Sequence, residues 1–287
     1  MNQTPKQNQS ATMSTTDSRF LGKTVVITGA GGNFGREGCL FFAKCGAKIA
    51  ALDKNITALQ DTVDKVNEAV PDAELVALEC DVTSPESVQS VMDQVVEKFE
   101  TIDMLWNNAG YQGEIKPTLD YDPADFALVM NINVTGMFIV LQSAARQMAK
   151  QETGGSIVNT SSVAGLRGTP AMVAYVSSKA AVLGMTVSTS KDLAPHNIRV
   201  NAVSPALIGP GYMWTRQNEL HAASGSPYFA TNPEIVATGK INSVPMKRLG
   251  TVSEVLKSVA FLLSDDASYT TGVNLVVDGG MAGGLKA

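Results

Sequence analysis

Tyr175 and Lys179 are the residues whose types and spacing could carry out proton transfer. They lie four positions apart in YVSSKAAV, a segment of helical character, so their side chains are expected to share one helical face. A tyrosine with an ordinary pKa of about 10 is a poor base at neutral pH. A nearby ammonium would stabilise the phenolate and lower that pKa. The pair is a candidate acid and base for a hydroxyl or carbonyl group, although the same spacing is also typical of a surface contact.

A glycine-rich turn near the start of the chain suggests a second kind of chemistry, the binding of an anion. The segment TGAGGNFG, residues 28–35, follows an apolar run and precedes a segment of helical pattern. Such a turn directs the first N–H groups of a helix, and the positive end of its dipole, toward a phosphate. Glycines let a pyrophosphate approach without a Cβ in the way. A plain turn without a ligand is the alternative.

Asp53 indicates which dinucleotide would bind. It ends the second predicted strand, where a carboxylate can accept hydrogen bonds from ribose hydroxyls and would repel an added 2′-phosphate. The sequence therefore favours NAD over NADP, although Lys54 and Arg36 are close enough in sequence to weaken the preference. The alternative role for Asp53 is an ordinary helix cap.

The elements that must position these residues follow from the pattern of the chain. From residue 23 onward, short β-branched runs alternate with longer segments of helical period. This alternation predicts an α/β fold: a doubly wound, mostly parallel seven-stranded sheet with helices on both faces, of the Rossmann type. The predicted strands cover residues 24–28, 48–53, 74–79, 104–107, 155–160, 199–203 and 274–277.

The domain organisation is expected to be simple. Residues 1–19 are rich in Gln, Asn, Ser and Thr and are predicted to form a disordered tail, whereas residues 20–287 are predicted to form a single dinucleotide-binding catalytic domain. The stretch from about 205 to 244 combines several prolines with its own aromatic residues and is predicted to be a lid insertion. A surface excursion that packs only for stability is the alternative.

Composition excludes several classes of partner. With 44% apolar and 17% charged residues, a net charge of −5 and no block of Lys or Arg, the chain is expected to bind a small molecule and not nucleic acid. No uninterrupted apolar run of about 18 residues suggests a membrane span. Three cysteines without Cys-x-x-Cys spacing and two histidines far apart in sequence predict no metal site and reduced thiols in the cytoplasm.

Eight short motifs, taken in order, resemble those of the short-chain dehydrogenase/reductase family. They are TGAGGNFG, CDVT (80–83), NNAG (107–110), NVTG (133–136), SSVAG (161–165), YVSSK (175–179), NAVSP (201–205) and TGVNLVVDGG (271–280). The resemblance covers roughly residues 20–281, and within the family it is similar to bacterial NAD-dependent xylitol dehydrogenases.

The resemblance implies a catalytic set of Asn133, Ser162, Tyr175 and Lys179. Asn133 would hold a water next to Lys179 and complete a proton relay. Ser162 would hydrogen-bond the substrate oxygen, and Tyr175 would take the hydroxyl proton as hydride leaves for the nicotinamide. Lys179 would also bind the nicotinamide ribose.

The binding residues follow from the same motifs and from the predicted sites above. Cofactor binding is assigned to Gly29, Gly32, Asn33, Phe34, Gly35, Asp53, Asp81, Val82, Asn108, Ala109, Gly110, Tyr175, Lys179, Pro205 and Ile208. Substrate binding is assigned to Ser162, Gln112, Tyr175 and Trp214. Trp106, inside a predicted strand, is expected in the core.

Two positions depart from the family pattern. Asn33 stands where the family usually has glycine, and the turn is expected to survive because Asn tolerates positive φ better than most residues. Ala206 stands where glycine usually follows the proline after the sixth strand. If that glycine used a left-handed backbone, the insertion would start at a different angle.

These observations lead to one main hypothesis and two alternatives. The main hypothesis is an oxidoreductase that transfers a hydride between NAD and a secondary hydroxyl or ketone of a small polyol or similar alcohol. The alternatives are an NADPH-dependent 3-ketoacyl or carbonyl reductase and a non-catalytic nucleotide-sensing protein of the same fold. The family is usually tetrameric or dimeric, which implies a homo-oligomer that uses its two late helices and C-terminal strand as contact surfaces.

Overall fold

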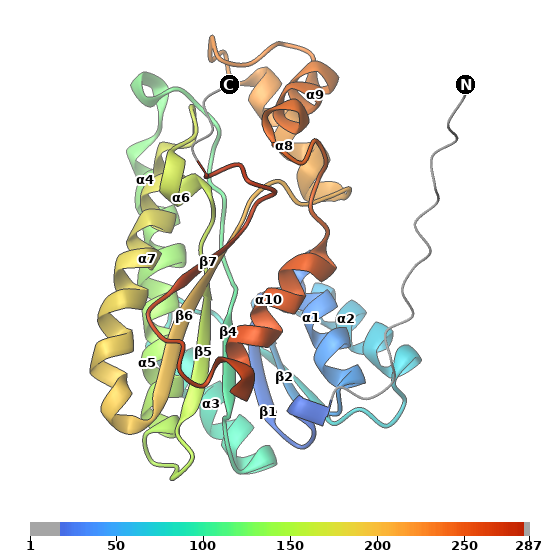
Figure 1. Cartoon of the computed structure of the whole chain (residues 1–287), viewed down its shortest axis with the longest axis vertical. Coiled ribbons are helices and arrows are strands. Elements are labelled where there is room, and N and C mark those ends of the chain that lie inside the picture. Colours follow the sequence, from blue (N-terminus) through green and yellow to red (C-terminus); the bar gives the residue numbers. More distant parts are fainter. Residues whose placement is uncertain (1–17, 284–287) are drawn as a thin grey trace.

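Seven parallel strands form one sheet between two layers of helices (Figure 1). The structure, a computed structural model, describes residues 18–283. The strand order is β3-β2-β1-β4-β5-β6-β7, which confirms the predicted doubly wound sheet. The strands are β1 (Thr24–Thr28), β2 (Lys48–Asp53), β3 (Leu75–Glu79), β4 (Met104–Asn107), β5 (Gly155–Thr160), β6 (Ile198–Pro205) and β7 (Asn274–Val277).

The predicted strand ends differ from the observed ones mainly at β6. This strand continues two residues past the predicted end because Ser204 and Pro205 pair with Val276 and Val277 of β7. The predicted tail, residues 1–19, lies almost entirely outside the described residues, and Ser18–Phe20 forms a 3-10 turn.

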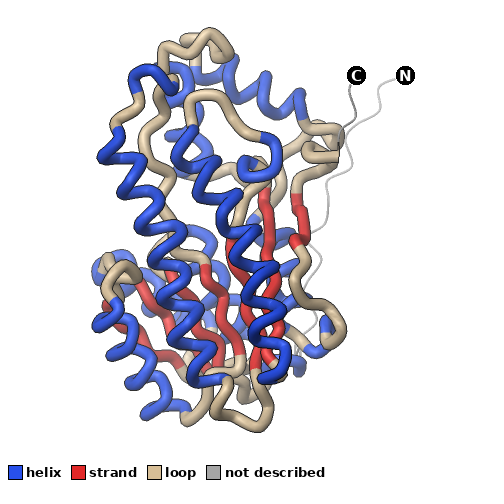
Figure 2. Tube along the Cα trace, turned by 90° about the vertical axis from the view of Figure 1, so that its left-hand side faces the viewer, coloured by secondary structure: helices blue, strands red, loops and turns tan. Residues whose placement is uncertain are grey.

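The helices divide between the two faces of the sheet (Figure 1). One face carries α1 (Asn33–Lys44), α2 (Ile56–Ala69) and α10 (Val252–Leu263). The other carries α3 (Pro85–Phe99), α5 (Met137–Met148) and α7 (Val173–Leu193). Figure 2 shows long helices lying across the strands, with loops and further helices beyond one end of the sheet.

Burial on both faces explains the nearly continuous apolar strands. In β1, Val25 and Ile27 belong to the core cluster under α1 and α10, whereas Val26 belongs to the cluster under α3 and α5. Trp106 is fully buried, as predicted, and its indole N–H donates to Thr160 Oγ1 at 2.9 Å. Gly38 of α1 packs so closely on this ring that a Cβ there would lie 2.3 Å from Cζ3.

The crevice for a ligand is set by strand β1, which pairs with both β2 and β4. The chain reverses its direction of winding here, so the loops after β1 and β4 separate at their carboxyl ends. Thr28 joins the two loops, because its hydroxyl oxygen accepts the N–H groups of Asn108 and Ala109, each at 2.9 Å.

One helical run is long and apolar enough, by length and composition alone, to cross a membrane. Helix α4 (Pro123–Met130), a π-helical segment (Asn131–Gly136) and α5 form the 26 residues Pro123–Met148, whose most apolar window has a mean hydropathy of 1.7. Polar residues interrupt the apolar sequence, which is why a search for an unbroken apolar run missed it. Core helices pass the same test, and here α5 packs against α3, β4 and β5.

The predicted insertion lies between β6 and α10. It contains α8 (Tyr212–Ala223) and α9 (Pro233–Ser243), which pack against each other beyond the carboxyl end of β6 (Figure 1). Ala206 does not have a positive φ, and its N–H donates to Val277 at 3.1 Å. The replacement of glycine therefore leaves the start of the insertion in ordinary backbone geometry.

Candidate active site

A cavity of about 400 Å³ opens at the carboxyl ends of the strands. It brings together twelve of the fifteen residues assigned to the cofactor and all four assigned to the substrate. Gly35, Asp81 and Val82 are not among its lining residues. Their contact with a cofactor stays a prediction.

The glycine turn forms one wall of this cavity and leaves room for an anion. Gly32 is the N-cap of α1, so no side chain caps the first N–H groups of that helix. Gly29 has a φ of +68°, and a Cβ there would lie 3.0 Å from Cα of Ala109. A helix N-terminus without a side-chain cap, in a turn this open, fits a pyrophosphate.

One expectation about this turn needs correction, and a packing role is added to another of its residues. Positive φ falls at Gly29 and not at Asn33, which is the first residue of α1 and fits there without strain. Gly35 is needed for packing, because a Cβ there would lie 2.2 Å from the carbonyl oxygen of Gly29. Its small size lets the first turn of α1 lie against the loop.

Asp53 is held at the cavity by the glycine turn. Its Oδ2 accepts the N–H of Gly31 at 2.8 Å, and its Oδ1 accepts the N–H of Asn55 at 2.8 Å. Asn55, not Asp53, caps α2 by accepting the N–H of Ala58 at 3.0 Å. Asp53 is therefore not the helix cap, which leaves its carboxylate at the cavity rim.

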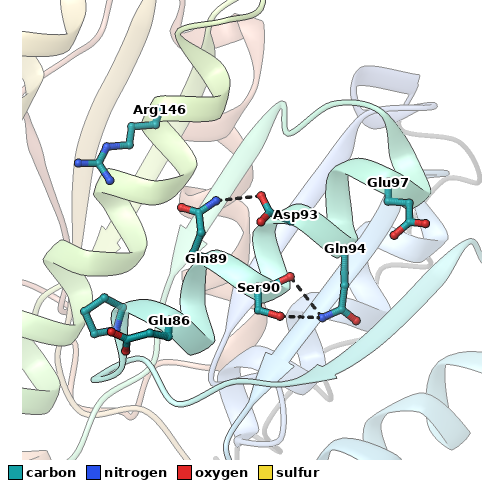
Figure 3. A pocket seen from close by; sticks show the side chains of 8 residues that line it. Glu86, Gln89, Ser90, Asp93, Gln94, Glu97 and Arg146 are labelled. Carbon is teal, nitrogen blue, oxygen red and sulfur yellow. Dashed lines mark hydrogen bonds between the residues drawn. The ribbon is translucent and has the colours of Figure 1, made fainter.

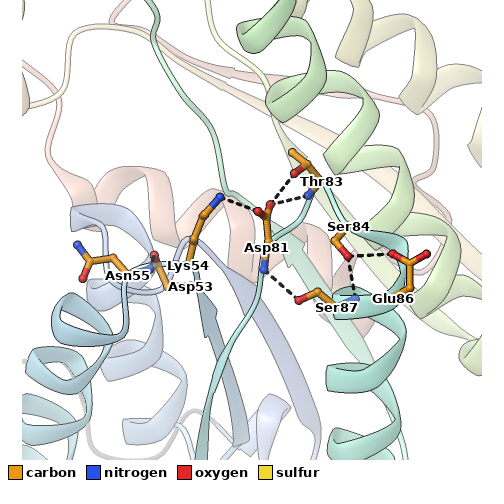
Figure 4. Close-up of polar contacts among 8 residues, drawn as sticks. All are labelled: Asp53, Lys54, Asn55, Asp81, Thr83, Ser84, Glu86 and Ser87. Carbon is orange, nitrogen blue, oxygen red and sulfur yellow. Dashed lines mark hydrogen bonds and ion pairs between the residues drawn. The ribbon is translucent and has the colours of Figure 1, made fainter.

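The two nearby cations are both engaged by other groups. Lys54 forms a 2.6 Å ion pair with Asp81, which also accepts bonds from Thr83 (Figure 4). These hydrogen bonds, with Lys54 the strongest, lower the pKa of Asp81 to about 2. Arg36 donates to the carbonyl oxygen of Gly31 at 3.0 Å and to Thr62 at 3.3 Å.

Lys179 and Tyr175 face the cavity from α7, as their spacing predicts. The Lys179 ammonium lies 5.5 Å from the centroid of the Tyr175 ring. It donates to the carbonyl oxygen of Thr160, at the end of β5, at 2.8 Å. Lys179 is only 3% exposed, and burial lowers its pKa to about 8.

The expected lowering of the Tyr175 pKa is wrong for this geometry. Burial raises the pKa of Tyr175, and a hydrogen bond with Ser162 opposes that rise. The ammonium of Lys179 is directed at Thr160 and not at the phenol oxygen. At neutral pH the phenol is therefore protonated, the form that can donate to a carbonyl oxygen.

Ser162 lies between the strand ends and α7. Its Oγ accepts the N–H of Ala164 at 3.1 Å and reaches the carbonyl oxygen of Pro205 at 3.5 Å. Ser162 and Tyr175 line the same cavity, and Ser162 is close enough to oppose the rise in the Tyr175 pKa. This arrangement can hold a substrate oxygen between a hydrogen-bond donor and a proton donor.

Asn133 is fully buried in the π-helical segment and does not line the cavity. Its amide exchanges hydrogen bonds with the backbone of Tyr111, at 2.7 and 2.8 Å, and donates to Ser178 at 3.0 Å. The side chain thus positions the loop after β4. Its role in holding a water next to Lys179 stays a prediction.

A second cavity, of about 300 Å³, adjoins the first. The two share Ser162, Tyr175, Ala206, Leu207 and Gln217. The second is also lined by His221, Phe229 and Lys240 of the insertion. Sequence reasoning missed His221 and Lys240, since only the contact between α8 and α9 brings them together.

Among the substrate residues, Gln112 and Trp214 both line the first cavity. Gln112 lies in the loop after β4, and Gln217 of α8 donates to its side-chain oxygen at 3.2 Å. Trp214 packs with its ring 5.5 Å from the Lys240 ammonium. The insertion therefore contacts both the β4 loop and the second cavity.

A hollow on the outer surface of α3 and α5 holds none of the predicted site residues. It is lined by acidic and amide side chains together with Arg146, and several of these side chains bond within α3 (Figure 3). Within residues 18–283, no group of three His, Cys, Asp or Glu side chains could hold a metal ion. The three cysteines are buried, and burial raises the pKa of Cys39 to about 12.

Comparison with known proteins agrees with this geometry. Residues 29–282 match the family model described as enoyl-(acyl carrier protein) reductase. The crystal structure of an NAD⁺-bound xylitol dehydrogenase is 51% identical, with a TM-score of 0.88 over 91% of this chain and 99% of that one. Levodione reductase of Leifsonia aquatica is 35% identical over 92% of this chain and 96% of its own. The 3-oxoacyl-(acyl-carrier-protein) reductase of Thermotoga maritima is 36% identical over 92% of this chain and 99% of its own.

Proposed function

The chain belongs to the short-chain dehydrogenase/reductase family, and we propose that it is an NAD-dependent dehydrogenase of the secondary hydroxyl of a small polyol or similar alcohol. The observation that carries the proposal is the meeting of Ser162, Tyr175 and Lys179 in one cavity with the glycine turn and Asp53. The similarity to an NAD⁺-bound xylitol dehydrogenase supports both the cofactor and the substrate class.

A bound nicotinamide dinucleotide supplies the hydride acceptor for this chemistry. The turn at Gly29 and Gly32 would hold its pyrophosphate, Asp53 its adenosine ribose and Lys179 its nicotinamide ribose. The open turn and the α1 N-terminus without a side-chain cap fit this group.

Side chains of the protein carry out the proton transfer. In oxidation, the Tyr175 phenolate accepts the proton of the substrate hydroxyl, while Ser162 donates a hydrogen bond to the same oxygen. In reduction, the Tyr175 phenol returns the proton. Lys179, one turn later on the same helix, is held by its bond to Thr160 and would bind the nicotinamide ribose.

The cofactor preference rests on the charge at the rim of the cavity. The Asp53 carboxylate would repel a 2′-phosphate. Lys54 is paired with Asp81, and Arg36 is bonded to Gly31, so neither cation is positioned to attract that phosphate. This supports NAD over NADP and weighs against the NADPH-dependent reductase, although a relative of that activity is 36% identical. The complete catalytic set weighs against a nucleotide sensor.

We also propose that the protein works as a homo-oligomer, dimer or tetramer, in the cytoplasm. Only 33% of the most apolar window of the 123–148 helical run is buried in the chain. Leu128 and Phe138 of this run and Val187 of α7 are exposed, and such an apolar surface favours subunit contact. The three buried thiols suit a reducing compartment.

A substrate screen tests the proposal directly. Purified protein is assayed with NAD and with NADP against C3 to C6 polyols, secondary alcohols and cyclic alcohols. The proposal expects turnover of a polyol with NAD. A strong preference for NADP would favour the reductase, and no turnover across the panel would favour the sensor.

A further inference from the structure

We propose that His221 and Lys240, from the two helices of the insertion, recognise a second hydroxyl group of the substrate. This inference rests on the proposed function and narrows it, because it requires an alcohol with at least two hydroxyls. The reacting hydroxyl would lie at Tyr175 and Ser162, and the second would lie in the adjoining cavity that these two residues share with His221 and Lys240.

The two side chains form one polar group in the second cavity, whose lining also includes Arg167 and Thr169. The Lys240 ammonium lies 3.1 Å from His221 Nδ1 and donates to Asn218 Oδ1 at 2.8 Å. The Phe229 ring lies 4.2 Å from the imidazole, centroid to centroid. His221 is 1% exposed, so this polar group is enclosed by the protein.

The position of the imidazole proton follows from its partner. His221 Nδ1 lies 2.7 Å from the carbonyl oxygen of Gln217, which can only accept a hydrogen bond. We assign the hydrogen to Nδ1 on this shorter contact, which leaves a lone pair on Nε2; in this tautomer the 3.1 Å contact between Nδ1 and the Lys240 ammonium is not a hydrogen bond. Burial, together with the charge of Lys240, lowers the pKa of His221 to about 4, which keeps the ring neutral at physiological pH.

The lone pair on Nε2 is the feature that supports a bound ligand. Within residues 18–283, Nε2 is one of few buried side-chain polar atoms without a hydrogen-bond partner. Enclosing an acceptor without a donor is costly, and native proteins rarely leave such groups unexplained. A hydroxyl hydrogen in the adjoining cavity would satisfy it.

His221 and Lys240 together also indicate which chemical group of a substrate would bind here. Nε2 offers an acceptor, and the Lys240 ammonium has hydrogens beyond the one given to Asn218. A hydroxyl matches both, since it donates and accepts. A carboxylate would place an oxygen lone pair against that of Nε2, and an apolar group would leave Nε2 without a partner. The geometry thus favours a polyol or diol over an acid or a simple alcohol.

Two variants of His221 distinguish a role in substrate recognition from a role in keeping the protein folded. In His221→Asn, the shorter amide can keep the donor to Gln217 but has nothing at the position of Nε2. In His221→Gln, the longer amide can place an acceptor near that position. Each protein is assayed with NAD on xylitol and on 2-pentanol, which lacks a second hydroxyl. NAD binding and thermal unfolding are measured to show that each variant is folded.

We expect His221→Asn to raise KM for xylitol roughly tenfold, the scale of one lost hydrogen bond, and to change the constants for 2-pentanol less than about twofold. In His221→Gln, KM for xylitol should be close to that of the unmodified protein. The inference would be overturned if His221→Asn raised KM equally for both alcohols, or if it left KM for xylitol unchanged. If unmodified enzyme turned over 2-pentanol but not xylitol, the inference would fall while the dehydrogenase assignment stood. If it turned over neither, with NAD or NADP, the proposed function itself would fail.

Discussion

The Lys179 ammonium donates to the carbonyl oxygen of Thr160 at 2.8 Å, which ties helix α7 to the end of strand β5. The bond satisfies a buried charge and fixes where Tyr175, one turn earlier, meets the cavity. The tyrosine is therefore positioned by the sheet through a lysine whose own pKa falls to about 8 on burial.

Replacing Tyr175 with Phe should lower kcat by at least about a hundredfold, because the reaction loses its proton acceptor and donor. NAD binding, followed by protein fluorescence, should persist. Tyr228→Phe is the matched control, since Tyr228 is 77% exposed and should tolerate the change. Near-normal turnover in the Tyr175 variant would remove this residue from the mechanism.

The two directions of the reaction should depend on pH in opposite ways. Burial raises the pKa of Tyr175, so the phenol needed for reduction predominates at neutral pH and the phenolate needed for oxidation increases with pH. From about pH 7 to about pH 10, kcat/KM should rise for oxidation and fall for reduction. Initial rates in both directions, in buffers of constant ionic strength, check this. Profiles that rise together would contradict it.

Asp53→Asn should reduce the preference for NAD over NADP by about tenfold, the effect of removing about 1.4 kcal/mol of repulsion. The amide oxygen can still accept the N–H of Gly31, so the turn should keep its shape. Asp53→Ala removes that bond as well and should also weaken NAD binding. The ratio of kcat/KM for the two cofactors is the measurement, and an unchanged ratio in both variants would assign the discrimination to another residue.

His221 should make the protein sensitive to mild acid. Its pKa is lowered from 6.5 to about 4 by burial and by Lys240, so the unfolded chain binds more protons in that interval. The stabilisation is present above about pH 6.5 and is lost as pH falls toward 4, on the order of 2–3 kcal/mol in total. Urea unfolding at about pH 7.5 and about pH 5 should show a smaller loss for His221→Gln than for the unmodified protein. Equal losses would show that other groups cause the effect.

Gly38→Ala should destabilise the fold by about 1–3 kcal/mol, the usual cost of overpacking. The added Cβ would lie 2.3 Å from the fully buried Trp106 ring. Gly239→Ala, in helix α9, is the control, because nothing lies within 4 Å of its added Cβ. That variant should be neutral or slightly more stable, since alanine favours helix over glycine. The midpoints of chemical unfolding compare the two.

The sheet could be predicted from sequence because each strand is a short apolar or β-branched run that can be recognised by itself. The run Val25, Val26 and Ile27 is apolar on both faces, as a buried parallel strand must be, and β1 has the predicted bounds. The residues that line the cavity follow from the same rule, since carboxyl ends of parallel strands share one edge.

What could not be predicted depends on contacts between distant segments. Asn55 caps α2, and Asp53 is left to contact Gly31, only because the glycine turn packs beside β2. The rise in the Tyr175 pKa comes from burial, which a four-residue spacing cannot reveal. His221 and Lys240 meet because α8 packs on α9, and no periodicity in the sequence marks that contact.

The hydrogen bond between Gln112 and Gln217 joins the loop after β4 to the insertion, and both residues line the first cavity. A neutral hydrogen bond of this kind contributes about 1 kcal/mol. The loop after β4 and the insertion are thus linked at the cavity by two amide side chains that carry no charge, so this link should depend little on pH or salt.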